Sequence, residues 1–346
     1  MINVERSMNQ ATQNAKYIAV ITGAIGAGKT TVFKSISRIL EERFNDSFLP
    51  IPEYIDSPEN GDLYRRNLSA YLSGELNDKS FQNIIQWYYE QALDPVLFND
   101  KVVILERSMS DSIAIFCNLA YHRGRLDITS FALLHGVCLL RDRAVNCPNY
   151  FLGNFDFVRI DSTLSEEQVT KQVLSVIESD LAAGVRTRVF GLDCHFAICK
   201  ERIDKRSRVD ESSTYDHSYT ALNSSMYSRL YDIIERSPHF VNFTELSSLF
   251  DSKLLRTYLI NQAISFVNSS KFNDSQACYM KLVETISPNS TESFKHRIEK
   301  ISKAFDFHAF ASTILSSSST TSTIGKISSS FIEQQLEQLL SVLQAN

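Results

Sequence analysis

The sequence lacks several features that define whole classes of protein. Acidic side chains (40) outnumber basic ones (35), giving a formal net charge of −5, so the general basic surface of a nucleic-acid-binding protein is absent. No apolar run reaches the roughly 18 residues that are needed to span a bilayer. Residues 1–16 are polar and lack the apolar stretch of a secretory signal. We therefore expect a cytoplasmic protein that binds neither nucleic acid nor membrane.

Paired cysteines are missing as well. The six cysteines are scattered along 346 residues, and no C-x-x-C pair occurs. The ligand spacing of a zinc site is therefore absent, and we expect reduced thiols rather than a disulfide framework. Apolar residues make up 43% of the chain and charged residues 22%, which are values of a globular protein. The length predicts a core domain with an addition.

Short apolar runs alternate with helix-like segments through the first two thirds of the chain. Strands are predicted at 17–22, 47–52, 102–105, 188–192 and 239–243, and helices at 29–44, 78–98, 109–121 and 165–183, the last with Ser165 as N-cap. The run at 155–160 also resembles a strand. Only one of the two runs, 155–160 or 188–192, needs to be the fourth strand of the sheet. We prefer 188–192, because the helix after it leads into a cluster of arginines. Strands that alternate with helices predict parallel pairing in a doubly wound α/β sheet.

The character of the chain changes after about residue 250. Glycines nearly vanish, and helix-like runs follow one another. Residues 312–330 are rich in Ser and Thr and predict a linker. Residues 331–343 predict an amphipathic helix that docks on its own domain or on a second copy of the chain.

A glycine-rich string follows the first predicted strand. It reads Gly23-Ala24-Ile25-Gly26-Ala27-Gly28-Lys29-Thr30-Thr31 and fits G-x-x-x-x-G-K-[ST]. In this pattern backbone N–H groups and a helix N-terminus surround phosphate oxygens, Lys29 reaches the β- and γ-phosphates, and Thr30 offers a hydroxyl to Mg²⁺. A chance match is the alternative, but the strand before the string and the helix after it favour nucleotide binding. The loop by itself does not distinguish a kinase from a GTPase or a motor.

Charged residues follow two other predicted strands. Glu106-Arg107-Ser108 comes after 102–105, and Glu53 comes after 47–52, so both motifs would lie at the carboxyl edge of the sheet, where open α/β folds bind ligands. Glu106 could hold Mg²⁺, Arg107 could hold a substrate hydroxyl or a phosphate, and Glu53 could accept a proton from an attacking hydroxyl. The alternatives are a surface ion pair for the first motif and helix capping or solvent exposure for Glu53.

A cluster of basic residues follows the strand at 188–192 and the helix after it. Residues 202–208 hold four cations in seven positions. Such runs are commonly solvated. In a phosphate-binding fold they could instead close over a triphosphate and neutralise charge on the transferring phosphoryl group.

In their order and spacing these motifs resemble those of the deoxynucleoside kinase family, which includes the herpesvirus-type thymidine kinases. The resemblance covers about residues 17–250 and rests on the phosphate loop, the Pro-Glu after the second strand, the Glu-Arg-Ser after the third, and an Arg-x-Arg-x-x-Glu lid. It implies a three-layer P-loop kinase fold with a five-stranded parallel sheet. The implied organisation is a polar tail (1–16), a kinase domain (17–250) with an insertion (about 146–184) and a lid (about 202–212), and a helical C-terminal extension (251–346).

The resemblance also implies roles for individual residues. Glu53 would be the general base for a nucleoside 5′-hydroxyl, and Arg107 would hold both that hydroxyl and Glu53. Thr30 and Glu106 would position Mg²⁺. The residues that would surround the phosphates of ATP, besides the loop and Lys29, are Arg202, Arg206 and Arg208.

The nucleoside itself would meet a second set of residues. Gln82 would make a two-pronged hydrogen bond to the base, and Phe116 would stack on it. The others are Tyr71 and Glu211 at the sugar 3′-hydroxyl, with Phe81 and Ser112 in the same pocket. Trp87 and Tyr88, which share a helix with Gln82, are interpreted as core residues.

Departures from the family pattern bear on base preference. Members selective for deoxycytidine and the purine deoxynucleosides carry an Arg and an Asp where this chain has Tyr89 and Ser112. The absence of both charged side chains resembles the thymidine-accepting members. Asp111 lies one residue from Ser112, however, and if it occupied the place of the missing Asp, the inference of a thymidine preference would no longer hold. A tryptophan common in the family is replaced by Pro58.

The resemblance therefore implies an ATP-dependent, Mg²⁺-requiring kinase that phosphorylates the 5′-hydroxyl of a deoxynucleoside, with thymidine as the first candidate, in nucleotide salvage, and as a homodimer. Two alternatives stay open. One is a nucleoside-monophosphate kinase such as thymidylate kinase, and the other is a P-loop NTPase that acts as a switch or scaffold.

Overall fold

The computed structural model describes residues 15–72, 75–93, 98–123, 125–206, 215–236, 241, 243–255, 257–259 and 261. They fall into two units, one with the described residues up to His122 and Ile128–Asp251, the other with Arg123–Asp127 and the residues from Ser252 on. In the second unit the Arg123 guanidinium lies 5.3 Å from the centre of the Tyr258 ring. The predicted linker 312–330 and helix 331–343 lie outside the described residues.

Five parallel strands form the sheet of the first unit, in the order β2-β3-β1-β5-β4. The strands are β1 (Tyr17–Gly23), β2 (Phe48–Ile51), β3 (Val102–Glu106), β4 (Asp156–Asp161) and β5 (Thr187–Asp193). Every residue of β1 and β3 is buried, as expected for central strands of a parallel sheet covered on both faces. The predicted five-stranded α/β fold of the P-loop kinase type is confirmed.

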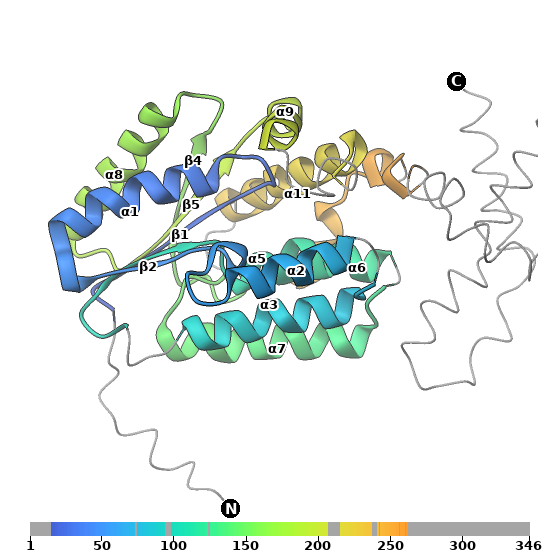
Figure 1. Cartoon of the computed structure of the whole chain (residues 1–346), viewed down its shortest axis with the longest axis horizontal. Coiled ribbons are helices and arrows are strands. Elements are labelled where there is room, and N and C mark those ends of the chain that lie inside the picture. The colour runs from blue at the N-terminus through green and yellow to red at the C-terminus, as the bar shows by residue number, and fades with distance from the viewer. Residues whose placement is uncertain are drawn as a thin grey trace, which may run out of the picture. The chain divides into compact units, whose positions relative to one another are not determined.

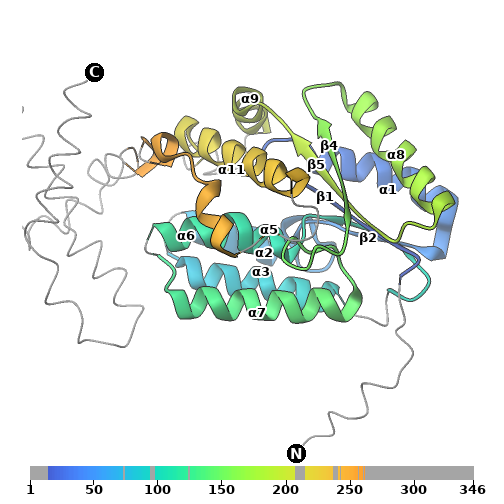
Figure 2. The same ribbon diagram turned by 180° about the vertical axis from the view of Figure 1, so that it is seen from behind.

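Helices cover both faces of this sheet. On one side lie α1 (Lys29–Phe44) and α8 (Glu166–Ala183), and on the other α3 (Asp78–Ala92), α5 (Met109–Asp111) and α7 (Ile128–Val145) (Figure 1). The reverse view shows the same two layers (Figure 2). Other helices are α2 (Gly61–Leu72), α6 (Asn118–His122), α9 (Phe196–Arg206) and α11 (His217–Arg236), with short turns η2 (Asn45–Ser47) and η3 (Tyr54–Asp56). No helix within the described ranges has the length and apolar character to cross a bilayer.

The fifth strand is not the one that the sequence predicted. Val241 is not in a strand, and Phe243 begins the 3₁₀ helix η5 (Phe243–Leu249). The N–H of Val241 instead donates to the carbonyl of Tyr150 (2.6 Å). The edge position belongs to β4, so the runs at 155–160 and 188–192 are both in the sheet. Because α8 crosses over the sheet between them, the two segments pair in parallel, and β5 lies beside β1 with β4 outside it.

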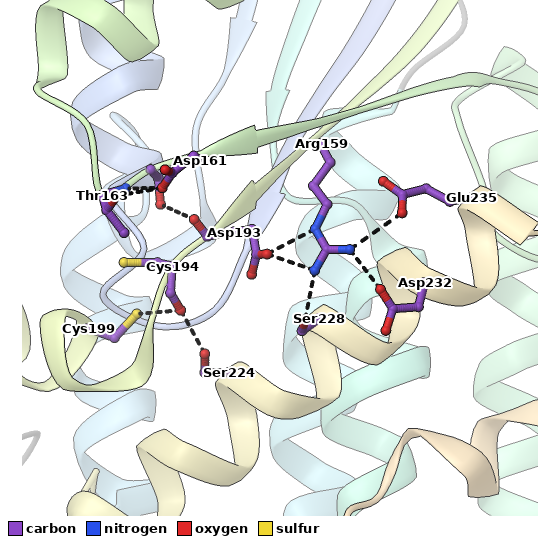
Figure 3. A network of polar contacts seen from close by, with 11 residues as sticks. Arg159, Asp161, Thr163, Asp193, Cys194, Cys199, Ser224, Ser228, Asp232 and Glu235 are labelled. Atoms are coloured by element: carbon purple, nitrogen blue, oxygen red, sulfur yellow. Dashed lines mark hydrogen bonds and ion pairs between the residues drawn. The ribbon is translucent and has the colours of Figure 1, made fainter.

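A charged network holds this edge strand to the helix that follows the lid region. The guanidinium of Arg159 on β4 donates to Asp193 at the end of β5 (2.9 Å) and to Asp232 (2.7 Å) and Ser228 (2.8 Å) on α11. Figure 3 shows Arg159 between these groups, with Glu235 on its far side. The network ties β4 to β5 and α11.

Two helix predictions need correction. The segment 109–121 is α5, a π-helical stretch η4 (Ser112–Cys117) and α6, rather than one regular helix. Trp87 was expected in the core but is 48% exposed, beside the ring of Tyr64 (6.4 Å between ring centres). Tyr88 is buried as expected, and its hydroxyl donates to the carbonyl of Pro52 (2.5 Å).

Candidate active site

The phosphate loop lies between β1 and α1, as its motif requires. Gly26 and Gly28 have φ angles of +84° and +93°, which glycine adopts without strain. A Cβ atom on Gly26 would lie 2.4 Å from the carbonyl oxygen of Cys199, so α9 contacts the loop directly. From α11, the side-chain oxygen of Asn223 accepts the N–H of Ile25 (3.0 Å). Two helices distant in sequence thus support the loop.

Lys29 is buried at the first position of α1. Its ammonium group donates to the carbonyl of Ala24 (2.9 Å). Burial, and then the neighbouring Arg107, lower the pKa of Lys29 below its usual value. A lysine in such a place gains from an anionic partner, and phosphate groups held by the loop would supply one.

Glu106 is fully buried and contacts the loop through Thr30. The Thr30 hydroxyl donates to one carboxylate oxygen of Glu106 (2.5 Å), while the other, Oε2, has no hydrogen-bond partner. Burial and the nearby charge of Glu53 raise the pKa of Glu106. A hydroxyl and a carboxylate are hard oxygen donors, and an orphaned buried oxygen calls for a partner, so the pair fits Mg²⁺ held together with phosphate oxygens. No larger group of metal-binding side chains occurs among the described residues.

Glu53 and Arg107 form a buried ion pair beside the loop. Arg107 Nη1 donates to Glu53 Oε1 (2.6 Å), and the two side chains are only 9% and 10% exposed, respectively. Arg107 Nη2 also approaches the carbonyl of Gly23 (3.4 Å). Although burial acts to lower it, the Glu53 carboxylate raises the pKa of Arg107, so the guanidinium stays charged. Arg107 has φ +65°, an uncommon conformation for a non-glycine residue that is concentrated at functional sites.

One cavity of about 550 Å³ joins this pair to the phosphate loop. The predicted nucleoside-binding residues that line it are Tyr71, Phe81, Gln82, Arg107, Ser112 and Phe116. The Ser112 hydroxyl donates to the amide oxygen of Gln82 (2.5 Å). The rings of Tyr71 and Phe81 are stacked, with centres 4.2 Å apart. The Arg107 guanidinium lies 5.1 Å from the centre of the Phe116 ring.

Further lining residues were missed by sequence reasoning. Tyr54 follows Glu53 directly. Tyr219 lies in the first turn of α11, and Tyr215, two residues before that helix begins, stacks on it with ring centres 5.1 Å apart. Helical spacing does not identify this pair, because Tyr215 lies before α11 begins and is brought against Tyr219 by the fold.

The predicted lid is described in part. Arg202 and Arg206, at the end of α9, line the cavity. Arg202 donates to the carbonyl of Ser162 (2.9 Å) and approaches that of Gly26 (3.5 Å). Arg208 and Glu211 lie outside the described residues.

Comparisons with known proteins place this geometry in context. Residues 19–146 match the family model described as deoxynucleoside kinase. No curated protein matches the chain. Among solved structures, it is similar to a deoxyadenosine kinase from M. mycoides with bound dATP, with 16% identity, a TM-score of 0.37 and coverage of 71% of this chain and 98% of that one. The family match spans the phosphate loop, Glu53 and Arg107.

Proposed function

We propose that this protein transfers the γ-phosphoryl group of ATP to the 5′-hydroxyl of a deoxynucleoside in nucleotide salvage, with thymidine as the preferred acceptor. The observation that carries the proposal is the buried Glu53–Arg107 pair, which shares one cavity with the phosphate loop and Gln82. A phosphate site, a carboxylate and an amide able to read a base are the parts that such a transfer needs.

The chain's own groups account for the chemistry. Glu53 would accept the proton of the 5′-hydroxyl as its oxygen attacks. Arg107 fixes Glu53 in one position through the 2.6 Å contact, and its remaining donors can hold the same hydroxyl. Lys29 and the loop N–H groups hold the triphosphate, so most of the acceleration would come from positioning and from stabilising charge.

Thr30 and Glu106 would hold Mg²⁺ beside the phosphates. When bound, the ion would neutralise charge on the β- and γ-phosphoryl oxygens. The unpartnered Oε2 of Glu106 supports this assignment. Arg202 and Arg206, together with Arg208 beyond them, are proposed to close over the same phosphates.

The preference for thymidine rests on the uncharged wall of the acceptor pocket. Tyr89 and Ser112 line the cavity where relatives of other specificity carry charges. Asp111 does not replace the missing acid, because its carboxylate accepts hydrogen bonds from the side chains of Thr22 and Tyr150 and from the N–H of Ser108. Gln82 can pair with the N–H and carbonyl of thymine without meeting a charge.

The main alternative, a nucleoside-monophosphate kinase, needs cations for a phosphate on the acceptor. Among the described lining residues, Arg107 is the cation on the acceptor side, and Glu53 already pairs with it. The other lining cations, Lys29, Arg202 and Arg206, come from the phosphate loop and α9. A second negative charge at Glu53 would therefore be repelled.

The test is a competition between thymidine and thymidylate as acceptors for labelled ATP. The proposal predicts thymidine monophosphate as the first product and little conversion of thymidylate. Phosphorylation of thymidylate alone would establish the monophosphate kinase, and ATP hydrolysis without any nucleoside product would establish a switch or scaffold.

A further inference from the structure

Arg107 lies in a turn whose backbone conformation is held from both sides. Its φ of +65° is one that a residue with a side chain adopts only where the surroundings fix it. The N–H of Arg107 donates to the carbonyl of Ile21 on β1 (3.0 Å), and the N–H of Ser108 donates to Asp111 Oδ2 (2.9 Å). Only the φ and ψ rotations of Arg107 separate these two N–H groups, so the two hydrogen bonds together fix its conformation.

One of the two hydrogen bonds depends on a side chain. The bond to Ile21 joins main-chain groups, whereas the bond from Ser108 needs the carboxylate of Asp111. That carboxylate is fully buried and is anchored from outside the turn, because Oδ1 accepts the hydroxyls of Thr22 on β1 and of Tyr150 (3.0 Å). Asp111 therefore ties the turn to the end of β1, where the phosphate loop begins.

The side chain of Arg107 depends on this conformation. Its Nη1 donates to Glu53 (2.6 Å), and its Nη2 approaches the carbonyl of Gly23 (3.4 Å), the residue after Thr22. The guanidinium lies at the far end of a long side chain, so a change in φ or ψ would swing it away from Glu53. A turn released from Asp111 could relax to a more common conformation, and the ion pair would then lose its alignment.

We propose that Asp111 is a positioning residue, which holds Arg107 through the N–H of Ser108 in the conformation that brings its guanidinium to Glu53. The effect on catalysis rests on the proposed function, since it assumes that this ion pair serves the acceptor hydroxyl. Asp111 does not line the cavity, and it acts on the reaction through Arg107.

A purely structural role for Asp111 predicts a different outcome. Asp111 also completes a capping box with Ser108, and the loss of a buried carboxylate lowers stability wherever its donors are left without a partner. Asp180 is the matched control. It is buried, it accepts the hydroxyl of Tyr17 (2.8 Å) and the guanidinium of Arg188 (2.7 Å), and it does not line the cavity.

The first measurement is the steady-state kinetics of Asp111→Asn in the full-length chain, with thermal unfolding to establish that it folds. The kcat with thymidine should fall at least about tenfold, the lower end of what a hydrogen bond to a charged group is worth, because Arg107 no longer aligns Glu53. The KM for ATP should not change, since Lys29 and the phosphate loop hold the triphosphate. Asp180→Asn should unfold at a lower temperature and keep its kcat.

Two milder variants decide the question if Asp111→Asn does not fold. Thr22→Val and Tyr150→Phe each remove one of the hydroxyls that anchor Oδ1 and keep the volume of the side chain. Each should lower kcat by a smaller factor than Asp111→Asn and leave the KM for ATP unchanged. Folded variants that both keep the wild-type kcat would count against the proposal.

The second measurement observes the arginine itself and needs no activity. In protein labelled at its arginine nitrogens, NMR resolves the Nη signals of a guanidinium that is held in an ion pair, and the spectrum of Arg107→Lys identifies those of Arg107. These signals should be present in wild type and Asp180→Asn and should be averaged in Asp111→Asn, or in Thr22→Val and Tyr150→Phe if that variant does not fold.

The two measurements separate the proposal from the function on which it rests. Unchanged Arg107 signals in folded Asp111→Asn, or a fall in kcat that Asp180→Asn reproduces, would overturn the positioning role and leave thymidine phosphorylation untouched. A chain that phosphorylates no nucleoside, but whose Arg107 signals are averaged in Asp111→Asn, would remove the proposed function and leave the positioning role standing.

Discussion

Replacing Glu53 with glutamine removes the proposed base and preserves its shape. The carboxylate accepts from Arg107 at 2.6 Å, and both side chains are nearly buried, so an amide of the same length can keep the contact. It cannot take a proton from an attacking hydroxyl. General-base catalysis contributes roughly 10²–10⁴-fold to a rate, which corresponds to about 3–5 kcal/mol of the barrier. We therefore expect the kcat of Glu53→Gln with thymidine to fall by about that factor.

The assay combines steady-state kinetics with ATP binding and thermal unfolding. ATP affinity should change little, since Lys29 and the loop contact the triphosphate instead. Glu59→Gln is the control, because Glu59 is exposed six residues further along the chain. A kcat within about threefold of wild type for Glu53→Gln, in a protein that unfolds at the normal temperature, would refute the role of Glu53.

Three further predictions concern stability and the phosphate loop. Burial raises the pKa of Asp142 to about 7 from 3.8, so the protonated carboxyl stabilises the folded protein fully below pH 3.8, and this contribution is lost as the pH rises through 7. Asp142→Asn should therefore flatten the fall in Tm between pH 5 and 8. An unchanged slope would contradict this. Gly26→Ala should weaken ATP binding, because the added Cβ would collide with the backbone of Cys199. Gly136→Ala is the comparison: its Cβ would meet nothing within 4 Å, so it should leave ATP binding unchanged and raise the unfolding free energy by roughly 0.5–1 kcal/mol. Equal effects of the two changes on ATP binding would be evidence against close contact at the loop. Arg159→Met should lower the unfolding free energy by about 1–3 kcal/mol in urea titrations, since it removes hydrogen bonds to charged partners that are partly screened by solvent. An unchanged unfolding free energy would mean that the network does not hold β4.

Much of the sheet could be predicted because local signals and tertiary structure agree there. The apolar run that became β1, the glycine string after it and the periodic helix α1 carry their pattern within a few residues of each other. Ser165, expected as the N-cap, likewise identified the start of α8, and in the structure its side chain accepts the N–H of Gln168. The edge strand could not be chosen in this way, since 155–160 and 239–243 have similar patterns. The structure pairs the first of them with β5 and holds it against α11 through Arg159, and a local pattern contains neither contact.

In the candidate site, too, local sequence patterns predicted some features, while others depend on contacts that only the fold creates. Glu53 and Arg107 were expected at one sheet edge because they follow neighbouring strands, and the structure places them 2.6 Å apart. The support of the loop by Asn223 and the hydrogen bond of Ser35 to Glu166, which lines the cavity, depend on contacts between segments more than 100 residues apart in sequence. Nothing in a local pattern predicts such contacts.

The position of the new phosphate ester tests the central claim most directly. Thymidine and ATP would be incubated with the protein, and the product would be examined by phosphorus–proton correlated NMR. The account predicts an ester at the 5′-oxygen, with one ADP formed for each ester and almost no product from Glu53→Gln. An ester at the 3′-oxygen, or ADP formed without any ester, would contradict it.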